Sequence, residues 1–407
     1  MNDACDSSPP TALDDVDREL TATIREHAAR LATALMRVTG DFAAAEDLVH
    51  DAVVVALRRW PVDGIPDRPD AWLFTVARNR GLDLLRRESN YRTKLEQLSW
   101  PVQPDPDDRL RLIFTCCHPA LPRPAQIALT LRVVCGLTTE QIARAFVVPE
   151  TTVAQRITRA KRKIADAAIP YRIPDPEDLD ERLDQVLAVI YLLLNEGYLS
   201  TADRPSSPRL VDDAEWLARM LHDLMPTEPE VAGLLALIRL HRARGAARFD
   251  AAGDLVQLAD QNRSSWDRPA IEAAVQLLER AARQRRPGQY QLQAAIVACH
   301  TDAARWEDTD WEQIVVLYDM LLTLAPSPIT RLHRAVALRY ATDAATALVE
   351  VDALADDLSA FHLLHATRAE LLRTLGRHDD ARAADLRALA LTANPAERQL
   401  LRRRADV

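Results

Sequence analysis

The chain has 407 residues, of which 48% are hydrophobic and 27% charged, with only 10 glycines and a formal net charge of −9. This composition excludes a disordered or collagen-like chain and is typical of a helix-rich protein of about two to four domains. The longest apolar run, 186–194, is too short to span a bilayer, and the acidic N-terminus lacks a basic leader and an apolar signal core. We therefore expect a cytoplasmic protein without membrane segments.

The five cysteines show no CxxC spacing, and their odd number fits a reducing compartment. Cys116, Cys117 and His118 are adjacent in the sequence, but neighbouring cysteines are poorly placed to complete a tetrahedral zinc site. Packed thiols are favoured over a metal here, and no metal or other cofactor is expected.

Charge is distributed unevenly along the chain. Residues 1–172 carry 24 Lys and Arg against 23 Asp and Glu, whereas residues 173–407 carry 27 against 37. A near-neutral part with local basic clusters, joined to an acidic part, indicates that the first part binds a polyanion and that the second has another role.

Two stretches rich in proline and acidic residues, 96–108 and 169–180, are predicted to be linkers because proline disfavours a helix interior. Elsewhere apolar residues recur at helical spacing and alternating β-branched runs are missing, so the predicted fold class is all-α. The linkers divide the chain into three parts: 15–95, 109–168 and 181–407.

The first part predicts two amphipathic helices. The first follows Asp41, a candidate cap, and buries a stripe that includes Val49, Val53 and Leu57. A loop over 61–70 precedes the second helix, where Trp72 is expected to pack in the core rather than stack on a base. The buried stripe of this second helix is predicted to consist of Leu73, Ala77, Gly81 and Leu84.

The second part contains LTTEQIARAFVVPETTVAQRITRAKRKI over 137–164, which predicts two short helices joined by a tight turn. Thr138 and Gln141 form a candidate capping box, and Pro149 ends the first helix. The inward stripe of the second helix is Val153, Ile157, Ala160 and Ile164. A merely solvated outer face is the usual alternative, but the capped helix, the turn and the basic second helix together favour a DNA-binding helix-turn-helix.

The first two parts together resemble an extracytoplasmic-function (ECF) sigma factor, the small sigma-70 type of bacterial initiation factor. The resemblance rests on GDFAAAEDLVHDAVVVAL, PDAWLFTVARNRGLDLLRR, LTLRVVCGLTTEQIARAF and PETTVAQRITRAKRKI, which follow in the family's order over about 18–168. It implies that a region 2 bundle (15–95) binds core polymerase and the −10 element, and that a region 4 helix-turn-helix (109–168) binds the −35 element. The implied partners are the RNA polymerase core, through its clamp and flap, and promoter DNA.

The resemblance also implies site residues. The core-docking helix would present carboxylates beside an exposed leucine to a basic helical partner, with helix capping as the alternative role for the carboxylates. This set is Glu46, Asp47, Leu48, His50 and Asp51. The −10 set is Arg78, Asn79, Arg80, Asp83, Arg86 and Arg87. In this set Asn79 would hold a flipped base, and the arginines would neutralise phosphates. The −35 set, in which Gln155 and Arg159 would reach base edges, is Thr151, Thr152, Gln155, Arg156, Arg159 and Arg162.

The C-terminal part is predicted to be a degenerate, tetratricopeptide-like α-solenoid. Its last helix pair has small residues at the expected spacing, namely Ala369, Gly376, Ala381 and Ala388, with Leu372, Leu375 and Leu389 as apolar fill. Asp385 departs from the pattern because an apolar aromatic is usual there, and Pro395 falls late. Similar pairs are predicted over 231–259, 271–304 and 311–340.

VLAVIYLLLNEGYLS (186–200) and CCHPAL (116–121) are similar to segments of one sigma subgroup with such tails. Residues 195–198 predict either a helix that ends at Gly197 or a contact with the DNA-binding half, and the sequence supports both. The solenoid suits a protein partner or intramolecular docking, and either an inhibitory or a required tail fits the sequence.

Two other classes of protein are compatible with parts of the sequence. A conventional helix-turn-helix regulator with a tetratricopeptide-like sensor domain would bind its operator without polymerase, usually as a dimer. The helices upstream of the helix-turn-helix disfavour it. The sequence has no Gly-rich phosphate loop, no GxSxG and no HExxH, so we expect no enzyme and no catalytic residue.

Overall fold

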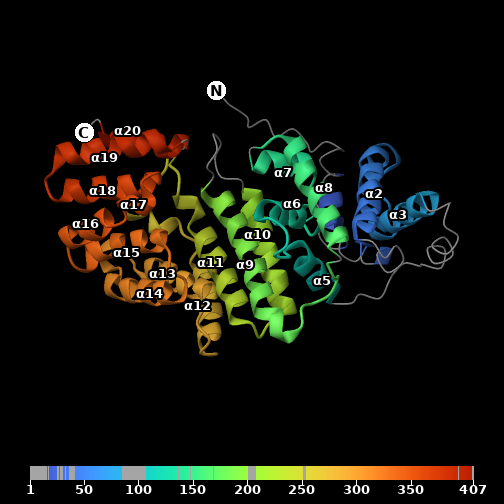
Figure 1. Ribbon diagram of the computed structural model, residues 1–407, viewed down its shortest axis with the longest axis horizontal. Helices are drawn as coiled ribbons and strands as arrows, with labels where there is room; N and C mark the ends of the chain where they lie inside the picture. Colours follow the sequence, from blue (N-terminus) through green and yellow to red (C-terminus); the bar gives the residue numbers. More distant parts are fainter. Residues whose placement is uncertain are drawn as a thin grey trace, which may run out of the picture. The chain divides into compact units, whose positions relative to one another are not determined.

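The computed structural model describes residues 42–84, 107–199, 208–250 and 254–405, except positions 136, 147, 168 and 393, together with scattered positions between 16 and 35. Regular structure in these ranges is helical, and the β-bridge found there joins Phe249 and Leu255. The predicted all-α class is confirmed (Figure 1). The chain divides into two units, 1–189 and 190–407. In the described ranges no helix is long and apolar enough to cross a membrane.

Proline begins many of the helices. At the first helical position proline sacrifices no hydrogen bond and its fixed φ suits the helix. The helices that start with proline begin at Pro69, Pro176, Pro208, Pro229, Pro328 and Pro395. The predicted linker 169–180 is therefore too long, because residues 176–180 already form the start of a helix with Glu177 and Asp178 at its favourable N-terminal end. Most of the other predicted linker, 96–106, lies outside the described residues.

The first helix pair of unit 1 consists of α2 (Phe42–Asp63) and α3 (Pro69–Leu84), which pack against each other. Leu73 and Ala77 of α3 and Ala56 of α2 are fully buried in one core, as the apolar spacing predicts. Trp72 is half-buried, packs against this core and meets Trp60 edge-on at a centroid distance of 5.5 Å. Asp41, the predicted cap, is outside the described residues.

The rest of unit 1 is α5 (Asp107–Cys116), α6 (Arg123–Val133), α7 (Thr139–Ala145), α8 (Glu150–Asp166) and the first part of α9 (Pro176–Leu199). Two side chains tie α9 to this group. Arg182 donates from Nη2 to the carbonyl of Phe114 at 2.6 Å, and Arg123 donates from Nη1 to the carbonyl of Gln185 at 3.0 Å. The first part of α9 therefore belongs with unit 1.

Unit 2 is a succession of helices that pack on their neighbours in chain order (Figure 1). They are α10 (Pro208–Leu224), α11 (Pro229–Ala243), α12 (Arg268–Ala282), α13 (Gln289–Asp302), α14 (Trp311–Leu324), α15 (Pro328–Ala341), α16 (Ala344–Asp352), α17 (Ala355–Leu358), α18 (His362–Thr374), α19 (His378–Leu391) and α20 (Pro395–Ala405). The predicted pairs over 271–304 and 311–340 correspond to α12/α13 and α14/α15. The predicted pair over 231–259 is wrong, because α11 is followed by the short 3₁₀ turns η1 (Gly245–Ala247), η2 (Leu258–Asp260) and η3 (Arg263–Ser265).

Gly197 does not end a helix, since α9 continues to Leu199. A Cβ built at Gly197 would lie 2.8 Å from the backbone nitrogen of Val211 and 2.9 Å from Cβ of Leu210. The glycine therefore allows α10 to approach α9 closely, and the predicted capping role at this position is wrong.

The last predicted helix pair is present as α18 and α19. Ala369, Leu372, Ala381 and Ala388 are buried as predicted, and Gly376 joins the helices with a φ of +75°, which favours glycine. Leu375 is 39% exposed, so its predicted role as apolar fill is wrong.

Candidate nucleic-acid interface

Two short helices, α7 and α8, form the helix-turn-helix that the sequence predicts. Thr138 caps α7, because its Oγ1 accepts a hydrogen bond from the Gln141 backbone N–H at 3.1 Å while the Gln141 side chain accepts one from the Thr138 backbone N–H at 2.8 Å. The turn ends at Pro149, and α8 begins at Glu150. The predicted inward stripe of α8 is buried at Val153, Ile157, Ala160 and Ile164. This burial fixes which face of α8 points outward.

The outward face of α8 is polar and basic. Thr151, Gln155, Arg159 and Arg162 are exposed, and Thr152 and Arg156 are half-buried. Arg162 forms an exposed ion pair with Asp166 at 3.4 Å. Such exposed pairs contribute only about 0–1 kcal/mol, so breaking this pair to let Arg162 contact a nucleic acid requires little free energy. All six predicted −35 side chains therefore lie on or beside one accessible surface.

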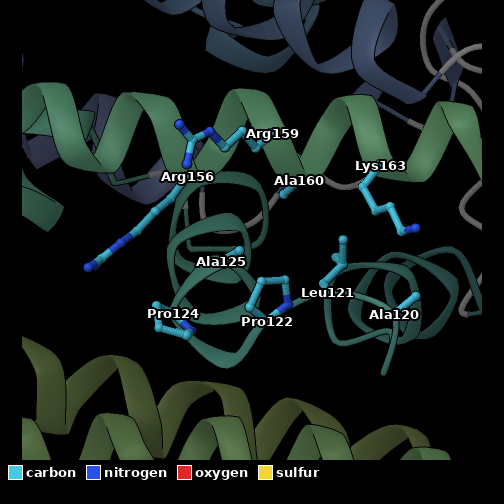
Figure 2. A pocket seen from close by; sticks show the side chains of 9 residues that line it. All are labelled: Ala120, Leu121, Pro122, Pro124, Ala125, Arg156, Arg159, Ala160 and Lys163. Atoms are coloured by element: carbon cyan, nitrogen blue, oxygen red, sulfur yellow. The ribbon is translucent and has the colours of Figure 1, made fainter.

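A hollow of about 450 Å³ lies beside this face. Its basic wall consists of Arg156, Arg159 and Lys163 of α8. Its other wall consists of small apolar side chains before and at the start of α6, namely Ala120, Leu121, Pro122, Pro124 and Ala125. Figure 2 shows Arg156 and Lys163 extending from opposite ends of this stretch of α8, with Ala160 between them. Lys163 is not among the six predicted −35 residues, although it follows Arg159 by one helical turn.

The outer end of α3 carries the predicted −10 residues. Asn79, Arg80 and Asp83 are exposed and Arg78 is half-buried, while Arg86 and Arg87 lie outside the described residues. The preceding loop is shorter than the predicted 61–70, because α2 continues through Pro61 to Asp63. Two apolar side chains are exposed here: Val62 (83%) in the last turn of α2 and Ile65 (39%) in the loop itself. Neither residue is among the predicted site residues, because no sequence pattern shows that a single apolar residue is exposed.

The predicted docking helix α2 contacts α8 within unit 1. Lys161 pairs with both Glu46 and Asp47, and Arg132 of α6 lies 3.6 Å from the Glu46 carboxylate. Glu46 is 5% exposed and Leu48 is 3% exposed, whereas Asp47 is open to solvent. The expected exposed leucine is wrong, because Leu48 is part of the α2/α3 core.

Comparison with known proteins decides the family. Residues 23–91 match the family Sigma-70 region 2, and residues 111–164 match Sigma-70, region 4. The chain is 34% identical to the ECF RNA polymerase sigma factor SigL of Mycobacterium tuberculosis over 153 residues, which are 36% of this chain and 86% of that protein. The chain belongs to the ECF sigma factors.

This sigma factor carries an additional C-terminal domain. It is 45% identical to the uncharacterized protein R00370 of Rhizobium meliloti over 390 residues, 92% of each chain. It is 29% identical to the probable ECF RNA polymerase sigma factor SigI of M. tuberculosis over 163 residues, 37% of this chain and 56% of that protein. Residues 182–282 match a family of unknown function, DUF6596. No solved structure matches the chain.

Electrostatics at the contact between region 2 and region 4 follow from burial. Burial opposes the charged form of Lys161, but Glu46 and Asp47 outweigh this effect and raise the pKa of Lys161. Burial, with the positive charges of Arg132 and Lys161, lowers the pKa of His50 to about 4. In this sigma factor His50 is therefore a neutral, half-buried group at pH 7.

The cysteines near region 4 are packed thiols. Cys116, Cys117 and Cys135 are buried, and the Sγ of Cys117 lies 3.5 Å from the Thr130 hydroxyl. Burial raises the pKa of Cys117 to about 11 and that of Cys116 well above its usual value, so neither is a thiolate at pH 7. No cluster of metal-ligating side chains occurs within the ranges that the structure describes.

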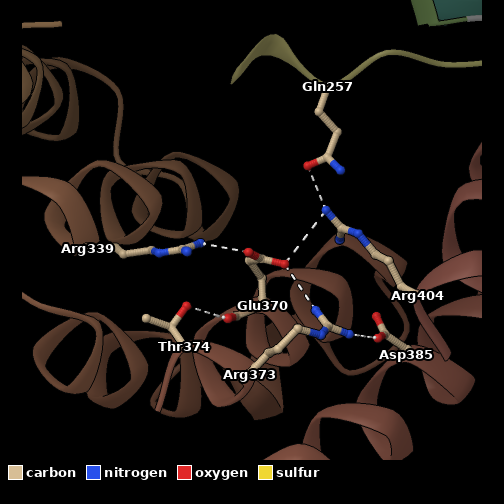
Figure 3. Close-up of polar contacts among 7 residues, drawn as sticks. All are labelled: Gln257, Arg339, Glu370, Arg373, Thr374, Asp385 and Arg404. Carbon is tan, nitrogen blue, oxygen red and sulfur yellow. Dashed lines mark hydrogen bonds and ion pairs between the residues drawn. The ribbon is translucent and has the colours of Figure 1, made fainter. Parts of the chain in front are cut away.

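In the C-terminal domain, the atypical Asp385 is fully buried and ion-paired with Arg373. Figure 3 shows Arg373 between Asp385 and Glu370, with Arg339 and Arg404 on the other sides of the Glu370 carboxylate. Arg404 also donates to Gln257 at 2.7 Å, which ties α20 to the segment after the β-bridge. Asp385 replaces the usual aromatic because it is one end of this network.

Proposed function

We propose that this ECF sigma factor directs the RNA polymerase core to promoters by reading a −35 element with α8 and a −10 element with the end of α3. The single observation that supports this most strongly is the exposed basic face of α8, which a fully buried apolar stripe holds outward. An outward, basic second helix of a helix-turn-helix suits the DNA major groove. The activity belongs in the cytoplasm, where the polymerase and the promoter are found, and involves no catalysis by this chain.

At the −35 element, Gln155 and Arg159 contact base edges. Both are exposed on the outer face of α8, where an amide can pair with adenine and a guanidinium with guanine. The remaining polar side chains of this face, Thr151, Thr152, Arg156 and Arg162, hold phosphates. Lys163 joins them because it lines the same hollow as Arg156.

At the −10 element, Asn79 holds a base that leaves the stack. Its exposed amide offers a donor and an acceptor to a base edge, and Arg78 and Arg80 are placed beside it to neutralise phosphates. Exposed Val62 and Ile65 supply apolar surface near the loop that precedes α3. Unstacking a base costs a few kcal/mol, which these contacts offset.

Core docking uses the exposed side of α2, with Asp47 as its principal carboxylate and His50 and Asp51 beside it. Lys161 pairs with Asp47 in the free chain, so a basic group of the polymerase competes with Lys161 for this exposed carboxylate. Glu46 has a largely structural role, since its carboxylate is buried between Lys161 and Arg132.

The test is transcription with purified core polymerase, supplemented with the full chain, on a library of genomic promoter fragments. We expect discrete start sites that depend on the chain. Asp47→Lys should reduce association with core at least fivefold, since it reverses the charge offered to a basic partner. The matched control is Asp63→Lys, an exposed position at the other end of the same helix.

Three outcomes would contradict the proposal: no specific transcript, no association with core, or a footprint on duplex DNA as tight without polymerase as with it. The last outcome would instead indicate a conventional helix-turn-helix regulator. Equal loss for Asp47→Lys and Asp63→Lys would remove the docking assignment alone.

A further inference from the structure

Cationic side chains from three segments of unit 2 lie close together. These segments are the end of α11, the residues before and at the start of α12, and the end of α13. The backbone N–H of Asp267 donates to the Ala243 carbonyl at 2.9 Å, which joins the first two segments. Arg263 donates from Nη1 to the carbonyls of His300 at 2.7 Å and Ala303 at 2.6 Å, which joins the third. We call Arg244, Arg263, Trp266, Arg268 and His300 the cationic cluster.

Two guanidinium groups of the cationic cluster are buried and form no ion pair with a carboxylate of the described residues. Arg244 is 6% exposed and Arg263 is 8% exposed, and in the described part of the chain no carboxylate pairs with either. The Nη2 of Arg244 lies 3.1 Å from the Nδ1 of His241. Buried charges in folded proteins are normally paired, because an uncompensated one loses its hydration without replacement.

The charges of the cluster oppose one another. Burial and the neighbouring Arg268 and Arg244 lower the pKa of Arg263, and the smaller opposing effect of Glu307 and Asp308 does not cancel them. Burial and the charges of Arg244 and Arg263 lower the pKa of His300 to about 3, so its imidazole is neutral. The acidic neighbours Glu307 and Asp308 are exposed, and Asp308 is bound by Arg305 at 2.8 Å.

The cationic cluster also has unused hydrogen-bond donors. Within the described residues, four buried nitrogens of the cluster have no hydrogen-bond partner: the Nε of Arg244, the Nη2 of Arg263, the Nε1 of Trp266 and the Nδ1 of His300. The first three are N–H donors, so they require an acceptor. The guanidinium carbons of Arg263 and Arg268 lie 4.9 Å and 5.8 Å from the Trp266 ring centre, which places positive charge on the ring that carries the third donor.

We propose that the cationic cluster binds a small oxyanion, the phosphate or carboxylate group of a small molecule. A guanidinium fork matches the geometry of both groups, and charge-assisted hydrogen bonds to them are the strong ones. Because Arg244 and Arg263 are buried, a small molecule matches the cluster better than a DNA backbone or a protein surface does. The C-terminal domain of this sigma factor thereby has a ligand site separate from its DNA-binding residues.

The experiment is isothermal titration of the full-length chain with inorganic phosphate and, in a second arm, with acetate, at constant ionic strength in chloride. We expect saturable binding of one of the two ions, which identifies the group. Arg244→Gln should weaken it about tenfold or more, as expected for a lost charge-assisted hydrogen bond. Arg283→Gln, an exposed arginine in the same unit, is the matched control and should bind like the wild type.

Absence of saturable binding of either ion by the wild type overturns the proposal, as does equal binding by wild type, Arg244→Gln and Arg283→Gln. Arg263→Lys serves as a second variant that keeps the charge and loses the fork, with far-UV circular dichroism as the check on folding. If both cluster variants lower the melting temperature by the same amount with and without the ion, the arginines are structural and the proposal fails.

Discussion

Arg159 is the side chain of α8 on which sequence-specific promoter reading depends most. It is exposed, it follows Gln155 by one helical turn, and it belongs to the same basic wall as Arg156. We expect Arg159→Ala to reduce −35-dependent initiation at least about fivefold, because a bidentate arginine–guanine pair contributes about 1–3 kcal/mol of discrimination. Association with core polymerase should stay unchanged.

The measurement is transcript yield on templates with an intact or a scrambled −35 element, beside a pull-down of core. Arg172→Ala is a matched control, since Arg172 is exposed and pairs with Asp175 outside α8. A parallel loss of transcription and core association would show that Arg159 maintains the fold of region 4 and does not read DNA.

At this scale the sequence predicts positions on a helix well and contacts between distant residues poorly. The capping box of Thr138 and Gln141 and the buried stripe of α8 follow from spacing alone, and both are present. The burial of Glu46 and Leu48 does not follow from spacing. Lys161, which pairs with Glu46 and Asp47, lies 114 positions from Asp47 in the sequence, and no local pattern joins these residues. The predicted docking surface therefore included two residues, Glu46 and Leu48, that the structure buries.

Among the elements, the contact of α8 with α2 has a consequence for activation. Lys161 forms an ion pair with Asp47, the carboxylate proposed for core docking, so core docking competes with this ion pair. We expect Lys161→Met to raise core affinity up to about fivefold, since pairs with one exposed partner contribute at most about 1 kcal/mol. Raising the salt concentration weakens the Lys161–Asp47 pair, which only the wild type has. The difference in core affinity between the variant and the wild type should therefore become smaller at high salt.

The measurement is the dissociation constant for core without DNA at two salt concentrations. Lys163→Met is the matched control, because Lys163 is exposed on the same helix. Unchanged affinity for Lys161→Met would show that the polymerase does not compete for Asp47.

Close packing between α9 and α10 gives a second prediction at the scale of elements. Gly197→Ala would place a Cβ 2.8 Å from the Val211 backbone, which cannot yield as a flexible side chain would. We expect destabilisation of about 1–3 kcal/mol by overpacking. Urea unfolding of the full chain measures it, with Gly245→Ala as control because a Cβ there meets nothing within 4 Å. Equal stability of the two variants would show that α10 moves away at little cost.

Prolines and irregular segments explain where elements were predicted incorrectly. Composition assigned 169–180 to a linker, but a proline at the first helical position is compatible with a helix, as α9 shows. The segment after α11 looked helical by its apolar spacing, yet it forms 3₁₀ turns that place Arg244 and Arg263 in one cluster. Asp385 looked like a defect in a repeat, but it completes a buried ion network. In each case tertiary contacts overrode the local pattern.

For the whole molecule, α9 determines where the chain can be cut. Its first part packs on region 4 through Arg182 and Gln185, and its side chains Leu183, Val186 and Leu187 are buried. We expect the free energy of unfolding of a chain of residues 1–168, measured by urea unfolding, to be at least about 3 kcal/mol lower than that of a chain of residues 1–189. The reason is that each buried aliphatic side chain contributes about 1.5–3 kcal/mol.

Initiation should then be assayed with residues 1–189, where loss of activity indicates a required C-terminal domain and a rise indicates an inhibitory one. Equal stability of the two truncated chains would show that α9 belongs wholly to the C-terminal domain, and that the cut at 168 is the correct one for the activity assay.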